Sequence, residues 1–305
     1  MKIGILCYPT YGGSGVVATE LGKELAQRGH EVHFISYSIP MRLKFSENIF
    51  FHKVEMSSYP LFDFSLYDLA LTSKIVEVAK YTGLDIVHAH YAIPHATSAY
   101  LAREILNSEN NSNKKKNPSS PLKIITTLHG TDITLIGLEI SFLPTMKFSI
   151  EKSDGVTAVS EFLKVNTISQ YNVNKEIEVI PNFIDLEHYK KIDTEETRCL
   201  RQRYAKHHEK ILVHTSNFRP LKRVDDCIKI FDEVRKKIPS KLLLIGDGPE
   251  RSNCEHLAKE LGIHDDVIFF GNLEEFVEIL SISDLFLMPS PLGNEAEFVQ
   301  FALTF

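Results

Sequence analysis

Short apolar runs of strand length alternate with helical patterns along the first half of the chain. These runs predict strands at residues 2–7, 32–36, 49–54, 85–89, 123–128, 155–158 and 177–180. A glycine-rich turn and a helical pattern over 15–28 follow the first run. Strands that alternate with helices pair in parallel, and the crossover helices cover both faces of the sheet. The pattern therefore predicts a doubly wound α/β domain.

The same alternation starts again at Lys210. It predicts strands near 211–215, 241–245, 267–270 and 284–288, and helices near 222–237, 250–261 and 274–281. Between the two series the chain is polar and charged with one amphipathic stretch, as is typical of a connection between domains. We therefore predict an N-terminal domain at 1–185, a hinge at 186–209 and a C-terminal domain at 210–305.

Residues 107–121 interrupt the first series with a low-complexity segment rich in Asn, Ser and Lys. The segment has little to bury, so we predict a mobile surface loop. Its run Lys114 to Lys116 could attract an acidic partner, although a solvated charge run is the simpler interpretation.

The composition narrows the classes of function. With 43% hydrophobic and 24% charged residues among 305, the chain can build two ordinary cores. A formal net charge of −6 argues against a broad nucleic-acid surface, so an anionic ligand must be met locally. No run approaches transmembrane length and the N-terminus lacks a signal-peptide core, so stable membrane insertion is not predicted. Four dispersed cysteines without a C-x-x-C pair indicate no disulfide framework and favour a cytoplasmic location.

The turn Gly12-Gly13-Ser14-Gly15 separates the first predicted strand from the first helix. Small residues at this point allow backbone N–H groups and the helix dipole to approach an anion. The turn matches neither G-x-G-x-x-G nor a P-loop, and simple turn chemistry is an open alternative. Its position at the carboxyl end of a strand favours a ligand role, because open α/β sheets bind ligands there.

Histidines cluster at the end of another predicted strand, at His88, His90 and His95, with Tyr91 among them. The H-x-H spacing places two imidazoles on one face of the strand, an arrangement that a metal site could use. No carboxylate or cysteine lies beside them at ligand spacing. Lining of a polar cleft, or pairing with the backbone, is therefore the favoured interpretation.

Two further segments follow strands of the first domain. His129-Gly130-Thr131-Asp132 emerges at the same sheet edge and could position a polar substrate, although a helix cap by Thr131 or Asp132 explains it equally well. Asn182 follows the last strand, where we expect it to face the cleft between the domains. A turn-forming role for Asn182 is the alternative.

The sharpest local signal lies after the first strand of the second domain, in Ser216-Asn217-Phe218-Arg219-Pro220-Leu221-Lys222-Arg223. Cations next to a helix N-terminus are unfavourable unless an anion shares the site, so this loop predicts phosphate binding. The later turn Gly246-Asp247-Gly248-Pro249-Glu250 joins a strand to a helix, and turn geometry alone would account for it.

These segments, in this order, resemble the family 4 retaining glycosyltransferases of GT-B fold from residue 1 to about 290. Within that family, residues 7–17, 88–96 and 128–134 are most similar to the members that act in bacillithiol biosynthesis. The resemblance implies two Rossmann-like domains with a cleft between them. It also implies transfer of N-acetylglucosamine from UDP-N-acetylglucosamine to L-malate with retention of configuration, without a metal or other cofactor.

The resemblance also assigns roles to matching positions. It places Arg219 and Lys222 on the departing diphosphate, and His129 beside the reacting sugar. The other donor-side candidates are Gly12, Gly13, Gly15 and Asn272. The acceptor-side candidates are Ser14, Tyr91, Thr131 and Asn182. In the family's front-face mechanism the leaving phosphate oxygen takes the acceptor proton, so the resemblance implies no separate protein base. The sequence leaves the possibility of a homo-oligomer open.

The resemblance ends after Ser290. There the family continues with a pair of glutamates on a loop and helix, whereas Glu295 and Glu297 here have Leu303 and Phe305 at the corresponding later positions. We predict a truncated or frameshifted ending, an incomplete second domain, and weak or no turnover.

Four other functions are alternatives to the transfer of N-acetylglucosamine to L-malate. Two of them are another family 4 sugar transferase and a non-catalytic nucleotide-sugar-binding fragment. A dinucleotide oxidoreductase is disfavoured because its glycine fingerprint is missing. A transferase acting on membrane lipids would use an apolar helix face that core packing explains better, formed by Phe142, Leu143, Met146, Phe148 and Ile150.

Overall fold

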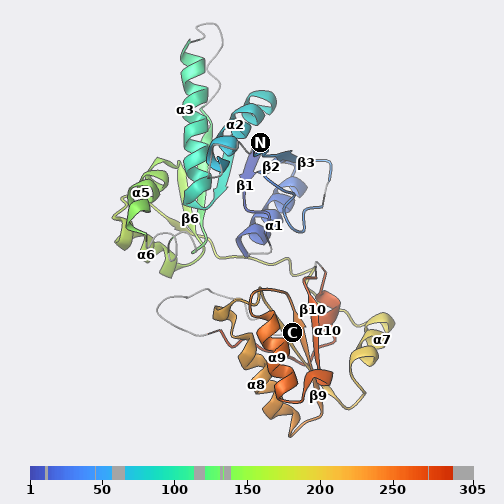
Figure 1. Cartoon of the computed structure of the whole chain (residues 1–305). Coiled ribbons are helices and arrows are strands. Elements are labelled where there is room, and N and C mark those ends of the chain that lie inside the picture. Colours follow the sequence, from blue (N-terminus) through green and yellow to red (C-terminus); the bar gives the residue numbers. More distant parts are fainter. Residues whose placement is uncertain are drawn as a thin grey trace. The chain divides into compact units, whose positions relative to one another are not determined.

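The computed structural model describes residues 1–10, 13–44, 46–56, 66–112, 121–130, 133, 139–273 and 275–290, without the side chains of 110–112. The chain divides into two compact units, Met1–Phe183 and Ile184–Phe305 (Figure 1). The stretch predicted as a hinge belongs to the second unit and contains helix α7 (Glu195–Tyr204). The predicted irregular ending, at 291–305, lies outside the described residues.

The first unit is built on one parallel sheet with the strand order β3-β2-β1-β4-β5-β6-β7. The strands are β1 (Lys2–Leu6), β2 (Glu31–Ser36), β3 (Ile49–Lys53), β4 (Ile86–His90), β5 (Lys123–Leu128), β6 (Gly155–Ala158) and β7 (Glu178–Val179). The chain winds outward from β1 to β3 and then returns to the other side of β1 at β4. The carboxyl ends of β1 and β4 therefore flank the switch point, where open α/β sheets bind their ligands.

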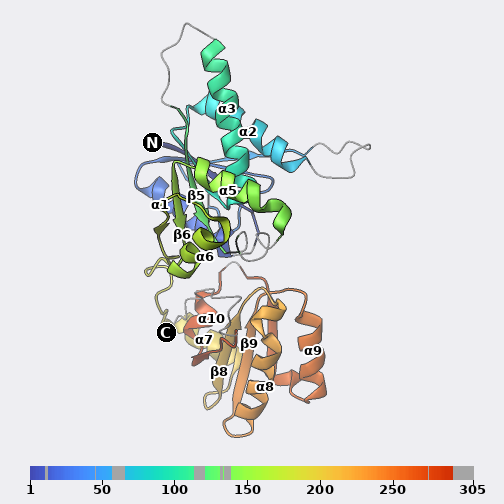
Figure 2. The ribbon, with the colours of Figure 1, turned by 90° about the vertical axis from the view of Figure 1, so that its left-hand side faces the viewer.

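Helices cover both faces of this sheet. They are α1 (Gly13–Gln27), α2 (Tyr67–Thr82), α3 (Thr97–Ser112), α5 (Leu143–Lys152) and α6 (Glu161–Tyr171), with a π-helical turn, η1, at Ala92–Ala96 and a 3-10 turn, η3, at Ile140–Phe142. Alternate residues of β1 point to opposite faces, so Ile5 packs with α1 whereas Leu6 packs with α2 and α3. Helices α2 and α3 lie side by side in Figures 1 and 2. The predicted loop at 107–121 is wrong for its first part, because α3 continues through Ser112.

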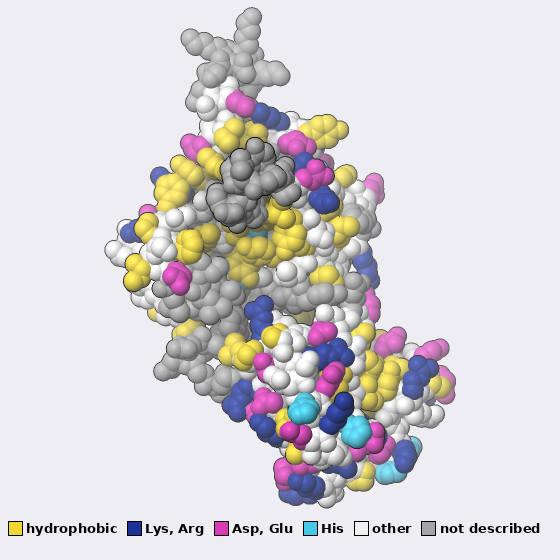
Figure 3. All heavy atoms as spheres, viewed as in Figure 1, with side chains coloured by type: hydrophobic (Ala, Val, Ile, Leu, Met, Phe, Trp, Pro, Cys, Tyr) yellow, Lys and Arg dark blue, Asp and Glu magenta, His cyan; other side chains and the backbone are white. Residues whose placement is uncertain are grey.

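The apolar stripe of α5 divides between core and surface. Met146 and Ile150 are fully buried, whereas Phe142 is 44% and Phe148 39% exposed. The Phe148 ring packs edge-on against Tyr100, with the ring centroids 4.8 Å apart. Figure 3 shows hydrophobic side chains gathered on this face of the first unit. Core packing thus accounts for the inner half of the stripe.

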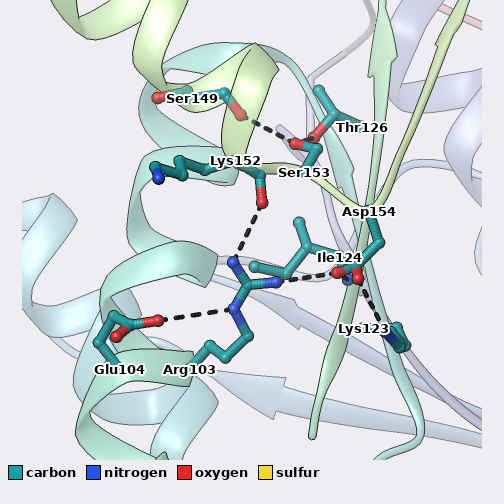
Figure 4. A network of polar contacts seen from close by, with 9 residues as sticks. All are labelled: Arg103, Glu104, Lys123, Ile124, Thr126, Ser149, Lys152, Ser153 and Asp154. Carbon is teal, nitrogen blue, oxygen red and sulfur yellow. Dashed lines mark hydrogen bonds and ion pairs between the residues drawn. The ribbon is translucent and has the colours of Figure 1, made fainter. Parts of the chain in front are cut away.

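A polar network fastens α3 and α5 to the amino end of β5 (Figure 4). The Asp154 carboxylate accepts the Ile124 backbone N–H at 2.9 Å, the Arg103 guanidinium at 2.8 Å and the Lys123 ammonium at 2.9 Å. Arg103 also donates to the Lys152 carbonyl at 3.0 Å. Burial opposes ionisation of Asp154, but these donors together hold its pKa below the ordinary value. This end of the strands is opposite the edge that carries the candidate chemistry.

The second unit contains a smaller parallel sheet with the order β10-β9-β8-β11. Its strands are β8 (Lys210–Thr215), β9 (Ser240–Ile245), β10 (Val267–Gly271) and β11 (Leu285–Phe286). Its later helices are α8 (Val224–Arg235), α9 (Arg251–Glu260) and α10 (Val277–Ser281), with 3-10 turns η4 at Pro220–Lys222 and η5 at His264–Asp266. Phe231 of α8 packs with Leu242 and Leu244, while Leu280 of α10 packs with Leu243 on the opposite face. Both units are therefore doubly wound, as the sequence predicts.

The helix predicted from residue 222 begins two residues later. Pro220–Lys222 form the 3-10 turn η4, Arg223 holds a left-handed conformation with φ of 49°, and α8 starts at Val224. The first turn of α8 carries Asp225 and Asp226, and Arg223 pairs with Asp226. The acidic first turn matches the helix dipole. The predicted cations at the helix start are present, because Arg223 is the N-cap of α8, Lys222 immediately precedes it, and Arg219 is the N-cap of η4.

Candidate active site

Two acceptor-side candidates meet at the carboxyl ends of β1 and β4. Ser14 lies in the first turn of α1, Tyr91 directly follows β4, and the Ser14 Oγ lies 2.6 Å from the Tyr91 Oη. Tyr91 has φ of 100°, a region that few residues other than glycine occupy. Its backbone N–H donates to the Thr127 carbonyl at 3.0 Å, which helps to hold this conformation. Backbone strain of this kind is concentrated at functional sites, so Ser14 and Tyr91 are the first candidates for the functional site at this sheet edge.

The glycines of the first turn differ in their surroundings. A Cβ at Gly15 would lie 2.5 Å from the Tyr8 carbonyl oxygen and 3.0 Å from that of Thr10. Only glycine therefore allows α1 to begin this close to the loop after β1. A Cβ at Gly13 would meet nothing within 4 Å, and Gly12 lies outside the described residues. The donor-side role of these glycines stays a prediction.

Three imidazoles stack along the same edge. The His88 and His90 rings have centroids 4.6 Å apart, and the His90 and His129 rings 5.1 Å apart, with interplanar angles of 27° and 18°. The predicted shared face of His88 and His90 is thus correct. His90 Nδ1 and His129 Nε2 are joined by a 2.8 Å hydrogen bond, and the Tyr91 ring lies 5.5 Å from that of His129.

His90, His95 and His129 are buried and His88 is half-buried, and all four are held in the neutral form. Burial lowers the pKa of His88 to about 4, of His95 to about 4 and of His129 to about 3, and it lowers that of His90 well below the ordinary value. At neutral pH the edge therefore offers polar nitrogen atoms without charge. Among the described residues, no group of His, Cys, Asp and Glu side chains is arranged to hold a metal ion.

Tyr8 and Tyr67, which no sequence motif singles out, complete this edge. The Tyr8 ring lies 4.7 Å from that of His95. His95 Nδ1 must donate to the His90 carbonyl, because a carbonyl oxygen only accepts. Its Nε2 therefore accepts from the Tyr67 hydroxyl at 3.5 Å. Tyr8 could have been found from its place at the end of β1, whereas Tyr67 reaches the site from α2, which no strand-end pattern indicates.

Two remaining candidates of the first unit differ in what can be said of them. Asn182 follows β7, and its Oδ1 is buried with no hydrogen-bond partner in the described part of the chain. A buried acceptor without a donor is unusual in a folded protein and is open to a ligand N–H or O–H. Thr131 lies outside the described residues.

The second unit carries an isolated pair of cations. Arg219 immediately precedes η4 and Lys222 is its last residue. Among the described residues neither is paired with a carboxylate, whereas Lys229 on α8 and Lys236 just after it both are. Burial, together with the nearby Arg219 charge, lowers the pKa of Lys222. Burial likewise lowers the pKa of His214, and the Lys222 charge adds to this effect. These two like charges have no described counter-charge, and their predicted contact with an anion stays a prediction.

The loop that carries these cations is pressed against the turn after β9. A Cβ at Gly246, where φ is 121°, would lie 1.8 Å from the Ser216 carbonyl oxygen, and one at Gly248 would lie 2.3 Å from that of Asn217. The Gly-Asp-Gly turn is thus required for packing against this loop, beyond its own turn geometry. Asn217 Oδ1 is buried without a described partner, whereas Asn272, after β10, is exposed. The uracil role of Asn272 stays a prediction.

Two parallel α/β units with polar groups at the carboxyl ends of their strands are the arrangement of a GT-B glycosyltransferase. Residues 11–188 match Glycosyltransferase Family 4, and residues 197–297 match Glycosyl transferases group 1. The chain belongs to glycosyltransferase family 4: it is a retaining hexosyltransferase that uses a nucleotide-sugar donor and an acceptor. The predicted family and fold class are confirmed.

Known proteins similar to the chain agree with this assignment. N-acetyl-alpha-D-glucosaminyl L-malate synthase of Bacillus anthracis is 47% identical over 291 residues, which are 95% of this chain and 73% of that protein. Alpha-monoglucosyldiacylglycerol synthase of Streptococcus pneumoniae is 27% identical, over 89% of this chain and 61% of its own length. Among solved structures, a glycosyltransferase from Rickettsia africae superposes with a TM-score of 0.70 at 20% identity, over 95% of this chain and 73% of that one. Anabaena HepE in complex with UDP and glucose superposes with a TM-score of 0.69 at 17% identity, over 95% of this chain and 74% of that one.

In the described part of the chain, no helix is long and apolar enough to cross a bilayer.

Proposed function

We propose that this enzyme transfers N-acetylglucosamine from UDP-N-acetylglucosamine to the hydroxyl of L-malate with retention of the anomeric configuration. The observation that carries the proposal is the 47% identity, over 95% of the chain, to a protein named for that product. The reaction would be the first step of bacillithiol biosynthesis. The unpaired cations of the second unit and the uncharged polar edge of the first unit support it.

The donor would bind through its diphosphate at Arg219 and Lys222. Negative charge grows on the diphosphate as the glycosidic bond breaks, and two fixed cations stabilise that charge more in the transition state than in the ground state. Burial and then the nearby Arg219 charge lower the pKa of Lys222, and an anionic ligand would offset both effects, which supports this role. Gly12, Gly13, Gly15 and Asn272 are the other proposed donor contacts.

The acceptor would bind in the first unit, at Ser14, Tyr91, Thr131 and Asn182. One hydroxyl of the Ser14–Tyr91 pair donates to the other, so the pair can offer one O–H to a carboxylate. Ser14 lies in the first turn of α1 and Tyr91 directly after β4, at the switch point of the sheet. His129 would contact the reacting sugar. Because burial keeps His129 neutral, it serves as a polar contact rather than as a base with a tuned pKa, and the leaving phosphate oxygen takes the acceptor proton.

An acceptor panel tests this proposal. The purified chain is incubated with UDP-N-acetylglucosamine labelled in the sugar, and with L-malate, D-malate, succinate, glycerol or diacylglycerol in turn. Labelled glucosaminyl-malate formed with L-malate and not with succinate, which lacks the hydroxyl, supports the proposal. Product with another acceptor alone would establish a different family 4 transferase, and saturable UDP binding without any product would establish a non-catalytic binding protein.

A further inference from the structure

His90 lies at the centre of the imidazole stack and is not among the residues expected to touch substrate. Its side chain is 1% exposed and lies between the rings of His88 and His129. The only described hydrogen bond of the His90 side chain joins its Nδ1 to Nε2 of His129, at 2.8 Å. Since a neutral imidazole carries one N–H, this bond requires one ring to donate and the other to accept.

The remaining nitrogen of His90 decides the direction of that bond. His90 Nε2 is buried, and no described group is within hydrogen-bond reach of it. If His129 donated to His90 Nδ1, the proton of His90 would sit on Nε2 as a buried donor without an acceptor. Buried N–H groups without a partner are rare and cost the full desolvation of the donor, whereas an unused lone pair is tolerated more readily. The proton of His90 therefore lies on Nδ1.

We infer that His90 is a positioning residue, which donates from Nδ1 to His129 Nε2 and so confines His129 to the tautomer protonated at Nδ1. The inference deepens the proposed function, because His129 is the residue proposed to contact the sugar. With its Nε2 occupied as an acceptor, His129 meets any partner of its Nδ1 as a hydrogen-bond donor. A sugar oxygen at that position would thus be met by a donor of fixed orientation, as electrostatic preorganisation requires.

The tautomer is measured directly by long-range ¹H–¹⁵N correlation spectra of the protein labelled with ¹⁵N at its histidines, at pH 7.5. Signals of His129 are assigned by their loss in His129→Gln, and the exposed histidines His207 and His208 provide the solvent reference. We expect His129 to show a protonated Nδ1 and an unprotonated Nε2. A protonated Nε2 in the wild-type protein would overturn the inference, whatever acceptor the enzyme uses.

Two substitutions separate positioning from packing. His90→Asn places an amide N–H near the position of Nδ1, so it should retain the Nδ1 tautomer of His129 and most of the kcat. His90→Phe keeps a flat ring in the stack without a donor, so it should release the tautomer and lower kcat about tenfold or more, with a smaller change in the KM for malate. Equal tautomer populations in both variants, with equal kcat, would show that His90 only fills space. Circular dichroism and thermal unfolding confirm that each variant is folded.

Discussion

Asp154 and Asp284 occupy equivalent positions in the two sheets. Each precedes a strand and accepts the backbone N–H of the neighbouring strand, from Ile124 at 2.9 Å and from Ile211 at 2.8 Å. Each also binds the lysine that precedes that isoleucine, and an arginine from a helix: Lys123 and Arg103 in the first unit, Lys210 and Arg201 in the second. The two units thus fix the amino ends of their strands by the same means (Figure 4 shows the first).

Removing either carboxylate charge should destabilise its own unit. Asp154→Asn and Asp284→Asn each weaken hydrogen bonds from charged donors, so each should lower the free energy of unfolding by about 1–3 kcal/mol. Urea denaturation followed by circular dichroism measures the loss. Asp193→Asn is the control, because Asp193 pairs with Arg198 at a fully exposed site and should show no measurable change. Equal effects at all three positions would contradict the prediction.

The buried histidines should make the first unit sensitive to mild acid. Their folded pKa values lie below the unfolded value of about 6.5, so the unfolded chain binds more protons below that pH. Their contribution is therefore fully present above pH 6.5 and is lost as the pH falls toward about 4, by about 1.4 kcal/mol per pH unit for each histidine. Asp154 and Asp284 lose their contribution at lower pH, because their ordinary pKa is 3.8 and their folded values are lower still.

Urea denaturation at pH 7.5, 6.0 and 5.0 checks this prediction. The midpoint should fall steeply between pH 6.0 and 5.0, before the carboxylates titrate. His207→Gln, at an exposed position, should leave the pH dependence unchanged. A stability that is flat between pH 7.5 and 5.0 would show that the stacked imidazoles are not held neutral.

A methyl group at Gly15 should disturb the start of α1. Its Cβ would approach the Tyr8 carbonyl oxygen to 2.5 Å, so Gly15→Ala must displace the helix or the loop and should lower both the melting temperature and kcat/KM. Gly13→Ala is the matched control for stability, because its Cβ would meet nothing within 4 Å. Thermal unfolding of the two variants measures the difference, and equal melting temperatures would refute the close packing at Gly15.

Lys222 should lower the folding stability of the unliganded protein and raise its affinity for UDP. Lys222→Met removes a half-buried ammonium beside Arg219, so the free protein should unfold at higher temperature. UDP should bind about tenfold or more weakly, because a charge-assisted contact to the diphosphate is lost. Isothermal titration with UDP measures the affinity. Lys229→Met is the control, since Lys229 is paired with Asp225 and should not affect UDP binding; an equal loss in both variants would remove Lys222 from the diphosphate site.

The sequence predicts the strands of both units well, because buried parallel strands are continuous apolar runs bounded by turn residues. It places Ser14 and Tyr91 at one edge by the same reasoning. The sequence predicts helix boundaries less well. Composition favours a loop at 107–112, where tertiary packing extends α3. Periodicity does not separate the turn η4 from α8. These errors reflect contacts between distant segments, which a local pattern does not contain.

The remaining features of the candidate site also depend on contacts between residues that are far apart in the sequence. Tyr67 reaches His95 from a helix that precedes it by 28 residues. The need for glycine at Gly246 comes from the carbonyl of Ser216, thirty positions earlier, and the direction of the His90–His129 bond follows from a partner that His90 lacks. Each depends on which atoms the folded chain brings together, so the sequence could name the residues but not these relations.

The backbone of Tyr91 bears on how the enzyme could change its acceptor. Its φ of 100° costs about 1–3 kcal/mol in a residue with a side chain and would cost a glycine almost nothing. Smaller replacements at this position remove the phenol from the proposed acceptor site, and glycine also releases the strain. Acceptor choice and folding stability therefore need not oppose each other at residue 91, which makes it a favourable starting point for redirecting the transferase to bulkier hydroxy acids.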